Sequence, residues 1–366
     1  MAAWLDLNYK PPLPASRDIG IAIVGAGEIV QSAHLPAYRK AGFHVVGIHD
    51  IHHARAQTVA DEFDIPRVYA SLGEIVHDSD VQIVDIAVGA KAQPSIVQQV
   101  VEGGKHVLCQ KPLAETYQQA CQIVKMCDEA GVRAGVNQQM RYAPGIRASK
   151  DVISRGWLGE LLQASIQVNV RTPFEHWSFL RDIETLEVMY HSIHYLDSIR
   201  YLLGTPEYVY ADGARYPGAV CRGETRTLIH LKFPGEVRGF IHDNHDNWAS
   251  EEDWYATFRF EGTRGIIKGT NGALYDYPHG RTDTISILSK EIDDVCWLTP
   301  KLGGRWFPDA FMGTMGELMA AIEEEREPEN SVRDNLLTLQ MVFASYLSMT
   351  ENRPVWLDEI EGRVPK

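Results

Sequence analysis

The sequence predicts an α/β plus α+β fold, in which a doubly wound parallel sheet is followed by a mostly antiparallel sheet flanked by helices. Up to about residue 137, short apolar runs alternate with segments of helix length. Beyond that point apolar and polar residues alternate one by one, as in strands with one solvated face. The length of 366 residues also exceeds what one hydrophobic core usually holds. We therefore expect an extended arm over 1–18, a first domain over 19–137 and a second over 138–366.

The first domain is expected to alternate strands with helices after a proline-containing arm that cannot be helical. Its strand candidates are nearly continuous apolar runs, which are typical of parallel strands covered on both faces: Ile19–Val24, Val45–Ile48, Ile83–Val88 and His106–Leu108. Helices are predicted over 33–41, 54–63, 94–102 and 116–130. Three of them are followed directly by glycine, which tolerates the left-handed conformation of a helix end. This alternation favours a doubly wound sheet.

The second domain begins with a period of two, in which apolar residues from Leu162 to Val170 alternate with polar ones. Further strands are predicted, with glycine and proline between them, over 208–214, 225–233, 237–242, 255–260 and 285–288. Long helical segments are expected over 185–203, 309–325 and 332–349. A mostly antiparallel sheet with helices on one face follows from this order.

Composition and charge exclude several classes of function. Lys and Arg number 35 against 49 Asp and Glu, and the net charge of −14 disfavours binding to nucleic acid or to an anionic membrane. The sequence has no uninterrupted apolar run of about 18 residues that would span a bilayer, and its first residues lack the pattern of a signal peptide. Five cysteines without a C-x-x-C pair argue against a disulfide framework and against a thiolate zinc site. The cytoplasm is the expected compartment.

A glycine turn follows the first predicted strand and opens the first helical segment. Gly25 and Gly27 allow a tight turn and the close approach of a dinucleotide pyrophosphate, although Val30 occupies the third glycine position of the usual pattern. Asp50 ends the second strand, where a carboxylate can bind the adenosine ribose hydroxyls. Because a carboxylate repels a 2′-phosphate, NAD is favoured over NADP. Arg55 and the adjacent histidines keep NADP possible.

Three segments resemble the Gfo/Idh/MocA family of oxidoreductases in order and spacing. The first is I-A-I-V-G-A-G, residues 21–27, with Asp50 after it. The second is G-G-K-H-V-L-C-Q-K-P-L-A, residues 103–114, which contains Lys111. The third is H-S-I-H-Y-L-D, residues 191–197. The resemblance runs from about Ile19 almost to the C-terminus, and the second segment followed by the third is its specific part.

The resemblance implies a Rossmann domain, a C-terminal antiparallel sheet domain and NAD(P)-dependent oxidation or reduction of a hydroxyl on a sugar, inositol or related polyol. It places Lys111 beside the nicotinamide and gives the acid/base role to His194. Removal of hydride from a secondary alcohol needs a group that takes its proton near neutral pH, and a cation can stabilise charge on the oxygen. The cofactor contacts expected from the resemblance are Gly25, Gly27, Glu28, Ile29, Asp50, Val88, Gln110 and Lys111.

Two positions depart from the family pattern. Gln110 stands where the family has a glutamate, and the loss of that negative charge should lower the pKa of Lys111. Tyr190 stands four residues before His194, where many members have an aspartate that orients the histidine. His191 is three residues before His194 and shares its helix face, so it is a further catalytic candidate that could replace the aspartate.

Two segments rich in polar and aromatic residues, 171–177 and 242–248, are candidates for sugar recognition. The expected substrate-binding residues are Lys111, Arg171, His176, Tyr190, His191 and His194. The pattern H-x-x-H occurs at 191–194 and at 242–245, and imidazoles at this spacing can ligate zinc. Because thiolates are absent and the resembling family uses metal-independent hydride chemistry, no metal is expected.

The sequence therefore predicts an NAD-dependent enzyme that transfers a hydride between nicotinamide and a hydroxyl carbon of a sugar, sugar acid or cyclitol. Its expected partner is a small polyhydroxylated substrate, and the resemblance implies a homodimer or homotetramer. Two alternatives stay open: a glycosidase or isomerase that oxidises a ring carbon only transiently, and a sugar-sensing regulatory protein without turnover. The departures at Val30, Gln110 and Tyr190 keep the last alternative open.

Overall fold

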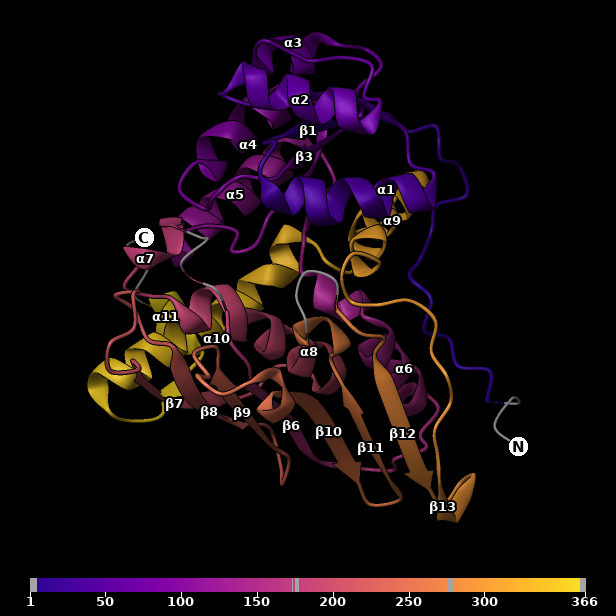
Figure 1. Cartoon of the computed structure of the whole chain (residues 1–366), viewed down its shortest axis with the longest axis vertical. Coiled ribbons are helices and arrows are strands. Elements are labelled where there is room, and N and C mark those ends of the chain that lie inside the picture. Colours follow the sequence, from indigo (N-terminus) through magenta and orange to yellow (C-terminus); the bar gives the residue numbers. More distant parts are fainter. Residues whose placement is uncertain (1–4, 173, 175–177, 276–279, 363–366) are drawn as a thin grey trace. The chain divides into compact units, whose positions relative to one another are not determined.

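The computed structural model describes residues 5–172, 174, 178–275 and 280–362, which pack into two compact units. Both predicted sheets are present (Figure 1). The parallel unit comprises residues 11–139 and 308–336, and the antiparallel unit comprises the described parts of 1–10, 140–307 and 337–366. The predicted fold class is therefore confirmed, whereas the predicted domain limits at 18/19 and 137/138 stay a prediction.

The parallel unit contains a five-stranded sheet in the order β2-β1-β3-β4-β5, with every pair of neighbours parallel. Its strands are β1 Ile21–Val24, β2 Val45–His49, β3 Ile83–Ile86, β4 His106–Cys109 and β5 Ala134–Val136. The first four confirm the apolar runs, and β5 was not predicted because it is only three residues long. The strand order reverses between β1 and β3, which is the place where doubly wound sheets bind ligands.

Helices cover both faces of this sheet. They are the π-helical turn η1 Val30–His34, α1 Leu35–Ala41, α2 His53–Phe63, α3 Leu72–His77, α4 Gln93–Glu102, α5 Tyr117–Ala130 and α9 Ala310–Glu323. Right-handed crossovers place α1 on one face and the helices from α2 to α5 on the other. Helix α9, from much later in the chain, packs against α1, β4 and β5 and so completes the first face. Of these helices, only α3 was not predicted.

The antiparallel unit contains a nine-stranded sheet in the order β13-β12-β11-β10-β6-β9-β8-β7-β14 (Figure 1). Its strands are β6 Leu161–Asn169, β7 Tyr208–Ala214, β8 Arg226–Lys232, β9 Arg238–Asn244, β10 Tyr255–Gly262, β11 Gly265–Thr270, β12 Thr284–Ser289, β13 Asp293–Leu298 and β14 Val355–Trp356. All neighbours are antiparallel except β6 and β9, which run parallel. In β8, Thr227, Ile229 and Leu231 are buried while the residues between them are more exposed, as the predicted period of two requires.

Helices pack on one side of this sheet, where α8 contacts β6 and β9 and α6 contacts β11 and β12. The helices are α6 Pro144–Ser154, α7 Ser178–Arg181, the π-helical turn η3 Val188–Ser192, α8 Ile193–Leu203, α10 Val332–Glu351 and α11 Asp358–Gly362. Short 3₁₀ turns lie at Gln139–Tyr142, Glu251–Asp253 and Gly272–Leu274. Among the helices that the structure describes, none has both the length and the apolar composition needed to cross a membrane.

Candidate active site

The glycine turn after β1 has the shape of a dinucleotide site. Gly25 has a φ of 107°, and a Cβ at this position would lie 2.5 Å from the carbonyl oxygen of Ala87 and 3.3 Å from Val88. Val88 therefore lies beside the turn, at the reversal of strand order. At Gly27 a Cβ would meet no described atom within 4 Å, and Glu28 begins the helical turn immediately after it. A pyrophosphate fits an open turn of this kind, because the first amides of a helix attract negative charge.

Asp50 is held at the glycine turn by the backbone. Its carboxylate accepts hydrogen bonds from the amides of Ala26 and His52, each over 2.8 Å. Arg55 also binds it, with Nη2 lying 2.6 Å and 2.8 Å from the two carboxylate oxygens. Burial alone would raise the pKa of Asp50, but the hydrogen bonds from Arg55, His52 and Ala26 outweigh it and lower the pKa. The predicted ribose-binding carboxylate is thus ionised, in place, and accompanied by a cation.

Lys111 lies in the turn that follows β4, at the same carboxyl end of the sheet. Gln93, which is fully buried, donates from Nε2 to the carbonyl oxygens of Gln110 (2.8 Å) and Pro112 (2.9 Å). The Gln110 side-chain oxygen accepts the backbone N–H of Lys111 over 2.8 Å, and the Lys111–Pro112 peptide bond is cis. Burial lowers the pKa of the half-buried Lys111 to about 8. The lysine can therefore exchange its proton near physiological pH.

A buried polar network behind Gln110 was not found from the sequence. His34 Nδ1 lies 2.7 Å from Asp85 Oδ2, and the Tyr38 hydroxyl donates to the same oxygen over 2.8 Å. His34 Nε2 then accepts hydrogen bonds from the amide groups of Gln110 (3.1 Å) and Asn137 (3.2 Å). Because Gln110 donates to His34 with its nitrogen, its oxygen is directed to Lys111. The signal in the sequence was Asp85, a lone charge within an apolar strand, which requires a buried partner.

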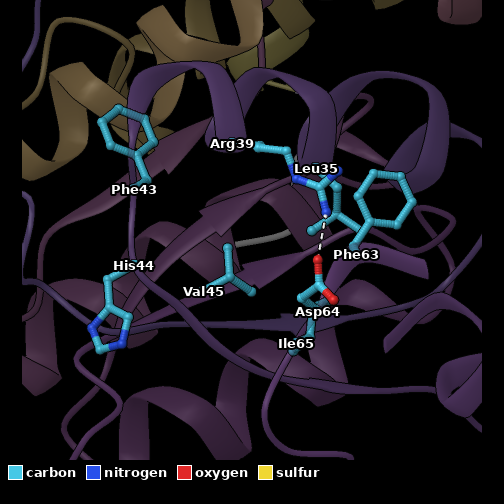
Figure 2. A pocket seen from close by; sticks show the side chains of 8 residues that line it. All are labelled: Leu35, Arg39, Phe43, His44, Val45, Phe63, Asp64 and Ile65. Carbon is cyan, nitrogen blue, oxygen red and sulfur yellow. Dashed lines mark hydrogen bonds and ion pairs between the residues drawn. The ribbon is translucent and has the colours of Figure 1, made fainter. Parts of the chain in front are cut away.

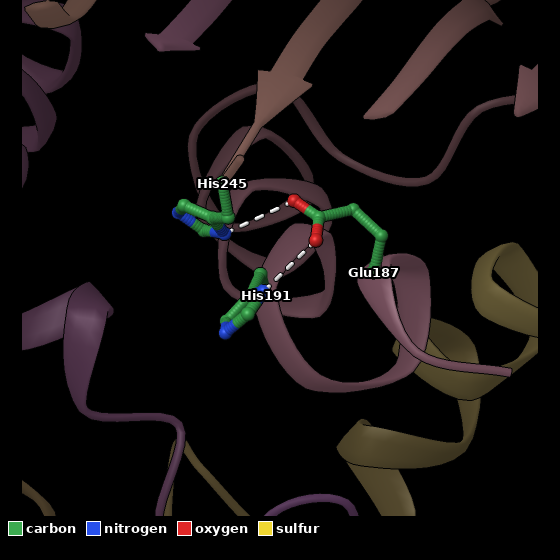
Figure 3. A group of neighbouring side chains, drawn as sticks. All are labelled: Glu187, His191 and His245. Atoms are coloured by element: carbon green, nitrogen blue, oxygen red, sulfur yellow. Dashed lines mark hydrogen bonds and ion pairs between the residues drawn. The ribbon is translucent and has the colours of Figure 1, made fainter. Parts of the chain in front are cut away.

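In the antiparallel unit, His191 is paired with a carboxylate that the sequence analysis did not single out. Glu187 Oε2 lies 3.0 Å from His191 Nδ1, and Glu187 Oε1 lies 3.0 Å from Nδ1 of His245 (Figure 3). The two imidazole rings are 3.9 Å apart between centroids and nearly perpendicular. Burial raises the pKa of Glu187 and of the neighbouring Asp243, and the charge of Glu187 raises that of Asp243 further. The E-x-x-x-H spacing was visible in the sequence, but the contact with His245 was not.

His194 and Tyr190 have different surroundings. His194 is buried in the first turn of α8 and its ring contacts Trp306, with 5.5 Å between the centroids. Tyr190 lies in η3 and packs against an apolar cluster that includes Phe174, Leu180 and Leu186. An aspartate at position 190 would place a charge against this cluster, which is a physical reason for the departure from the family pattern.

The remaining predicted residues are dispersed. Arg171 is exposed and forms an isolated bridge with Asp246 after β9, and His176 lies outside the described residues. Asp197, the last residue of the segment 191–197, is buried, and it accepts hydrogen bonds from Arg141 and Thr338. This aspartate therefore has a structural role in the antiparallel unit.

A surface pocket in the parallel unit lies away from all of these residues. It is lined by side chains before and after β2, among them Arg39 and Asp64, which form an exposed ion pair over 3.5 Å (Figure 2). None of the eight residues that line this pocket belongs to the predicted site. The structure thus brings together Gly25, Asp50 and Val88 around one turn, and places His191 and His194 on consecutive helical turns of the other unit.

Family models match two thirds of the chain. Residues 19–138 match an oxidoreductase family described as having an NAD-binding Rossmann fold. Residues 146–274 match the GFO/IDH/MocA C-terminal domain. The chain belongs to the GFO/IDH/MocA family. The protein is therefore an oxidoreductase, and its parallel unit is the NAD-binding domain that the glycine turn and Asp50 predicted.

GFO/IDH/MocA relatives match along most of the chain. A D-apiose dehydrogenase from Paraburkholderia graminis is 27% identical over 94% of this chain and 91% of its own length. A 2,7-anhydro-N-acetylneuraminate hydratase from Mediterraneibacter gnavus is 27% identical over 70% of this chain and 67% of its own. An oxidoreductase from Agrobacterium radiobacter, solved with NAD+, L-tartaric acid and magnesium, shares the fold, with a TM-score of 0.81 and 21% identity over 94% of this chain and 99% of its own.

Proposed function

We propose that the protein is an NAD-dependent dehydrogenase that oxidises or reduces a hydroxyl carbon of a sugar, sugar acid or cyclitol. The observation that carries the proposal is Lys111, a half-buried lysine with a pKa of about 8 in the turn after β4. In a Rossmann sheet that turn lies at the ligand-binding end of the strands. The D-apiose dehydrogenase that matches along most of the chain supports a sugar as the substrate.

Each catalytic residue has a separate proposed task. The Lys111 ammonium donates a hydrogen bond to the substrate oxygen and stabilises negative charge on it. His194 takes or returns the hydroxyl proton as general acid/base, with His191, fixed at Nδ1 by Glu187, as the further candidate. Tyr190, Arg171 and His176 belong to the proposed substrate-binding set. The bound nicotinamide supplies the hydride acceptor or donor, and the protein supplies position and charge.

The proposed cofactor contacts are those of the glycine turn and its neighbours, Gly25, Gly27, Glu28, Ile29, Asp50, Val88, Gln110 and Lys111. NAD is supported by the ionised Asp50 carboxylate at the end of β2. Arg55 occupies both oxygens of that carboxylate and is itself half exposed. Since the guanidinium could turn toward a 2′-phosphate, NADP stays the alternative cofactor.

One observation favours a second candidate function. The relative from Mediterraneibacter gnavus is named a hydratase, not a dehydrogenase. A reaction without net oxidation agrees with the alternative in which the sugar ring is oxidised transiently and then reduced again by the same cofactor.

The two candidates are separated by a screen of sugars, sugar acids and inositols, with NAD and NADP in parallel. With a dehydrogenase, NADH accumulates as a free sugar or polyol is oxidised, and the absorbance of NADH follows the reaction. Cleavage or isomerisation of a substrate without NADH accumulation would support the second candidate and contradict the first. A higher rate with NADP than with NAD would overturn the cofactor assignment at Asp50.

The pH dependence of the reaction should report on Lys111. If the ammonium form stabilises the substrate oxygen, kcat/KM falls as pH rises through the lysine pKa of about 8. Gln110→Glu places a negative charge beside Lys111 and should raise this apparent pKa by about one unit, so activity persists to higher pH. The measurement is kcat/KM against pH for both proteins.

Gln99→Glu provides a control, because Gln99 is exposed on α4 and its Nε2 binds only the carbonyl oxygen of Ser95 among the bonds described for it. This variant should leave the pH profile unchanged. An unshifted profile for Gln110→Glu would contradict control of the Lys111 pKa by residue 110.

A homodimer or homotetramer is part of the proposal. On the side of the nine-stranded sheet opposite its helices, Tyr210, Leu228 and Trp356 are exposed on β7, β8 and β14, which are adjacent strands. Apolar side chains gathered on a sheet face are typical of a contact between subunits. The mass of the protein in solution tests whether it forms a homodimer or a homotetramer.

A cytoplasmic location is also proposed, supported by five free cysteines.

A further inference from the structure

Glu187, His191 and His245 form a cluster where the helices of the antiparallel unit meet the end of β9 (Figure 3). Glu187 precedes η3, His191 lies within η3, and His245 directly follows β9. Figure 3 shows the Glu187 carboxylate facing both imidazole rings from one side, with each oxygen 3.0 Å from one Nδ1 atom. Two imidazole rings and one carboxylate, each a possible metal ligand, thus meet from the region of η3 and from the end of β9.

The cluster is buried, and it contains a second carboxyl group, that of Asp243, beside that of Glu187. The side chains of Glu187 and Asp243 are fully buried, and that of His245 is 2% exposed. Among the described residues, Glu187 Oε1 and Asp243 Oδ1 accept no hydrogen bond, although they lie 3.0 Å and 3.8 Å from the two nitrogens of the His245 ring. A buried carboxylate oxygen without a donor is costly unless a proton, a cation or a metal ion compensates it. The cluster therefore has oxygen lone pairs that a metal ion could use.

We propose that Glu187, His191 and His245 bind a divalent transition-metal ion of the zinc class, through the Glu187 carboxylate and Nδ1 of each histidine. Zinc bonds to imidazole nitrogen and carboxylate oxygen are about 2.1 Å long, which separates the ligands of a tetrahedral ion by about 3.4 Å. One ligand atom from each of the three residues lies within 4.8 Å of the other two, and each Nδ1 lies 3.0 Å from one Glu187 oxygen. Small side-chain movements suffice to admit the ion. Two imidazoles favour zinc over magnesium or calcium, which prefer oxygen ligands.

The surrounding residues orient His245 as a ligand. Its other nitrogen, Nε2, lies 3.4 Å from the Tyr195 hydroxyl and 3.8 Å from Asp243. Ser192 fixes Asp243 by donating to its other oxygen over 2.6 Å. A histidine that binds metal through one nitrogen commonly has a carboxylate or hydroxyl at the other, which fixes the ring and raises its basicity.

The site uses one histidine from each H-x-x-H segment, a combination that the sequence alone did not indicate. Neither segment contributes both of its histidines to the cluster, and His245 reaches His191 only through the packing of β9 against η3. With three protein ligands, the ion keeps at least one position open to water or another oxygen donor. Bound metal would tie η3, which carries Tyr190 and His191, to the end of β9.

The test is metal uptake by the full chain without an affinity tag, after treatment with a chelator. Equilibrium dialysis against Zn²⁺ should give about one ion per chain, and Co²⁺ should produce the visible absorption of a nitrogen- and oxygen-ligated ion. His245→Gln and Glu187→Gln should weaken Zn²⁺ binding at least about tenfold. His191→Gln, at a less buried position, should do the same with less risk to folding, which far-UV circular dichroism monitors.

His242→Gln is the matched control, because His242 lies on β9 three residues before His245 but is not one of the residues of the cluster. It should retain full uptake. Substoichiometric Zn²⁺ in the wild-type chain would overturn the proposal. So would equal Zn²⁺ uptake by the wild type and by folded His191→Gln and His245→Gln. Uptake is measured without NAD or substrate, so this result and the proposed dehydrogenase activity can fail independently.

Discussion

Replacing Lys111 with alanine is expected to lower kcat by about 10²–10³-fold, the usual cost of removing one group that stabilises a developing oxyanion. The reason is that Lys111 is the cation at the ligand-binding end of the sheet whose pKa burial has lowered to about 8. NAD affinity should stay within about threefold, because the glycine turn and Asp50 hold the adenosine half of the cofactor. Steady-state kinetics and titration of NADH fluorescence measure the two effects separately.

The control for this change is Lys125→Ala. Lys125 lies on α5 in the same unit, with its side chain 74% exposed, and it pairs with the exposed Glu129 one turn along the helix. Its loss should leave both kcat and NAD affinity unchanged. Full turnover in Lys111→Ala would refute the proposed mechanism, whereas loss of NAD binding would show that the lysine acts on the cofactor and not on the substrate.

Replacing Asp197 with alanine is expected to destabilise the antiparallel unit by about 3–5 kcal/mol, because it removes the carboxylate that pairs with the buried Arg141 guanidinium. Arg141 binds the two Asp197 oxygens over 2.6 Å and 2.7 Å, and both side chains are at most 3% exposed. Thr338 of α10 donates to the same carboxylate over 2.6 Å, so the variant also loosens α10 from α8. Urea unfolding followed by tryptophan fluorescence measures the loss.

Asp182→Ala is the matched control within the same unit. Asp182 and Arg222 form an ion pair over 3.5 Å in which the side chains are 80% and 65% exposed. Exposed pairs of this kind contribute about 0–1 kcal/mol. If Asp197→Ala unfolded at the same urea concentration as Asp182→Ala, the buried pair would not be a main support of the unit.

The fold was largely predictable because its strongest signals are local. Apolar runs such as 83–88 and the alternation that begins at Leu162 are set by which faces of a strand are buried. The structure confirms both strands, although Leu162 itself is exposed and Ser165 is buried. Strands β11 and β13 were not predicted. β11 begins at Gly265 just after another glycine-bearing turn, and β13 is an edge strand with exposed Asp294 and Val295, so neither shows a clear hydrophobic period.

The site was predictable only where its residues are neighbours in the chain. The glycine turn and the segment containing Lys111 are continuous, and the family match agrees with both. The buried polar pairs of both units are brought together by tertiary packing. Asp85 binds His34 across 51 positions of the chain, and His245 contacts Glu187 across 58 positions. A sequence pattern can show that a buried Asp85 needs a partner, but it does not say which residue the sheet will place there.

Helix α9 has a consequence for how the protein is synthesised. Phe311 on this helix packs against His34, Thr314 donates to Asn137 over 2.8 Å, and Asn330, just after the helix, donates to the carbonyl oxygen of Val136 over 2.9 Å. These residues leave the ribosome almost two hundred positions after β5. Until nearly the whole chain has emerged, this face of the nascent Rossmann sheet is therefore covered only in part, by α1. A fragment that ends after residue 139 would lack α9. We therefore expect this fragment to bind the cofactor more weakly than the full chain does, because part of the support of its sheet comes from the other end of the polypeptide.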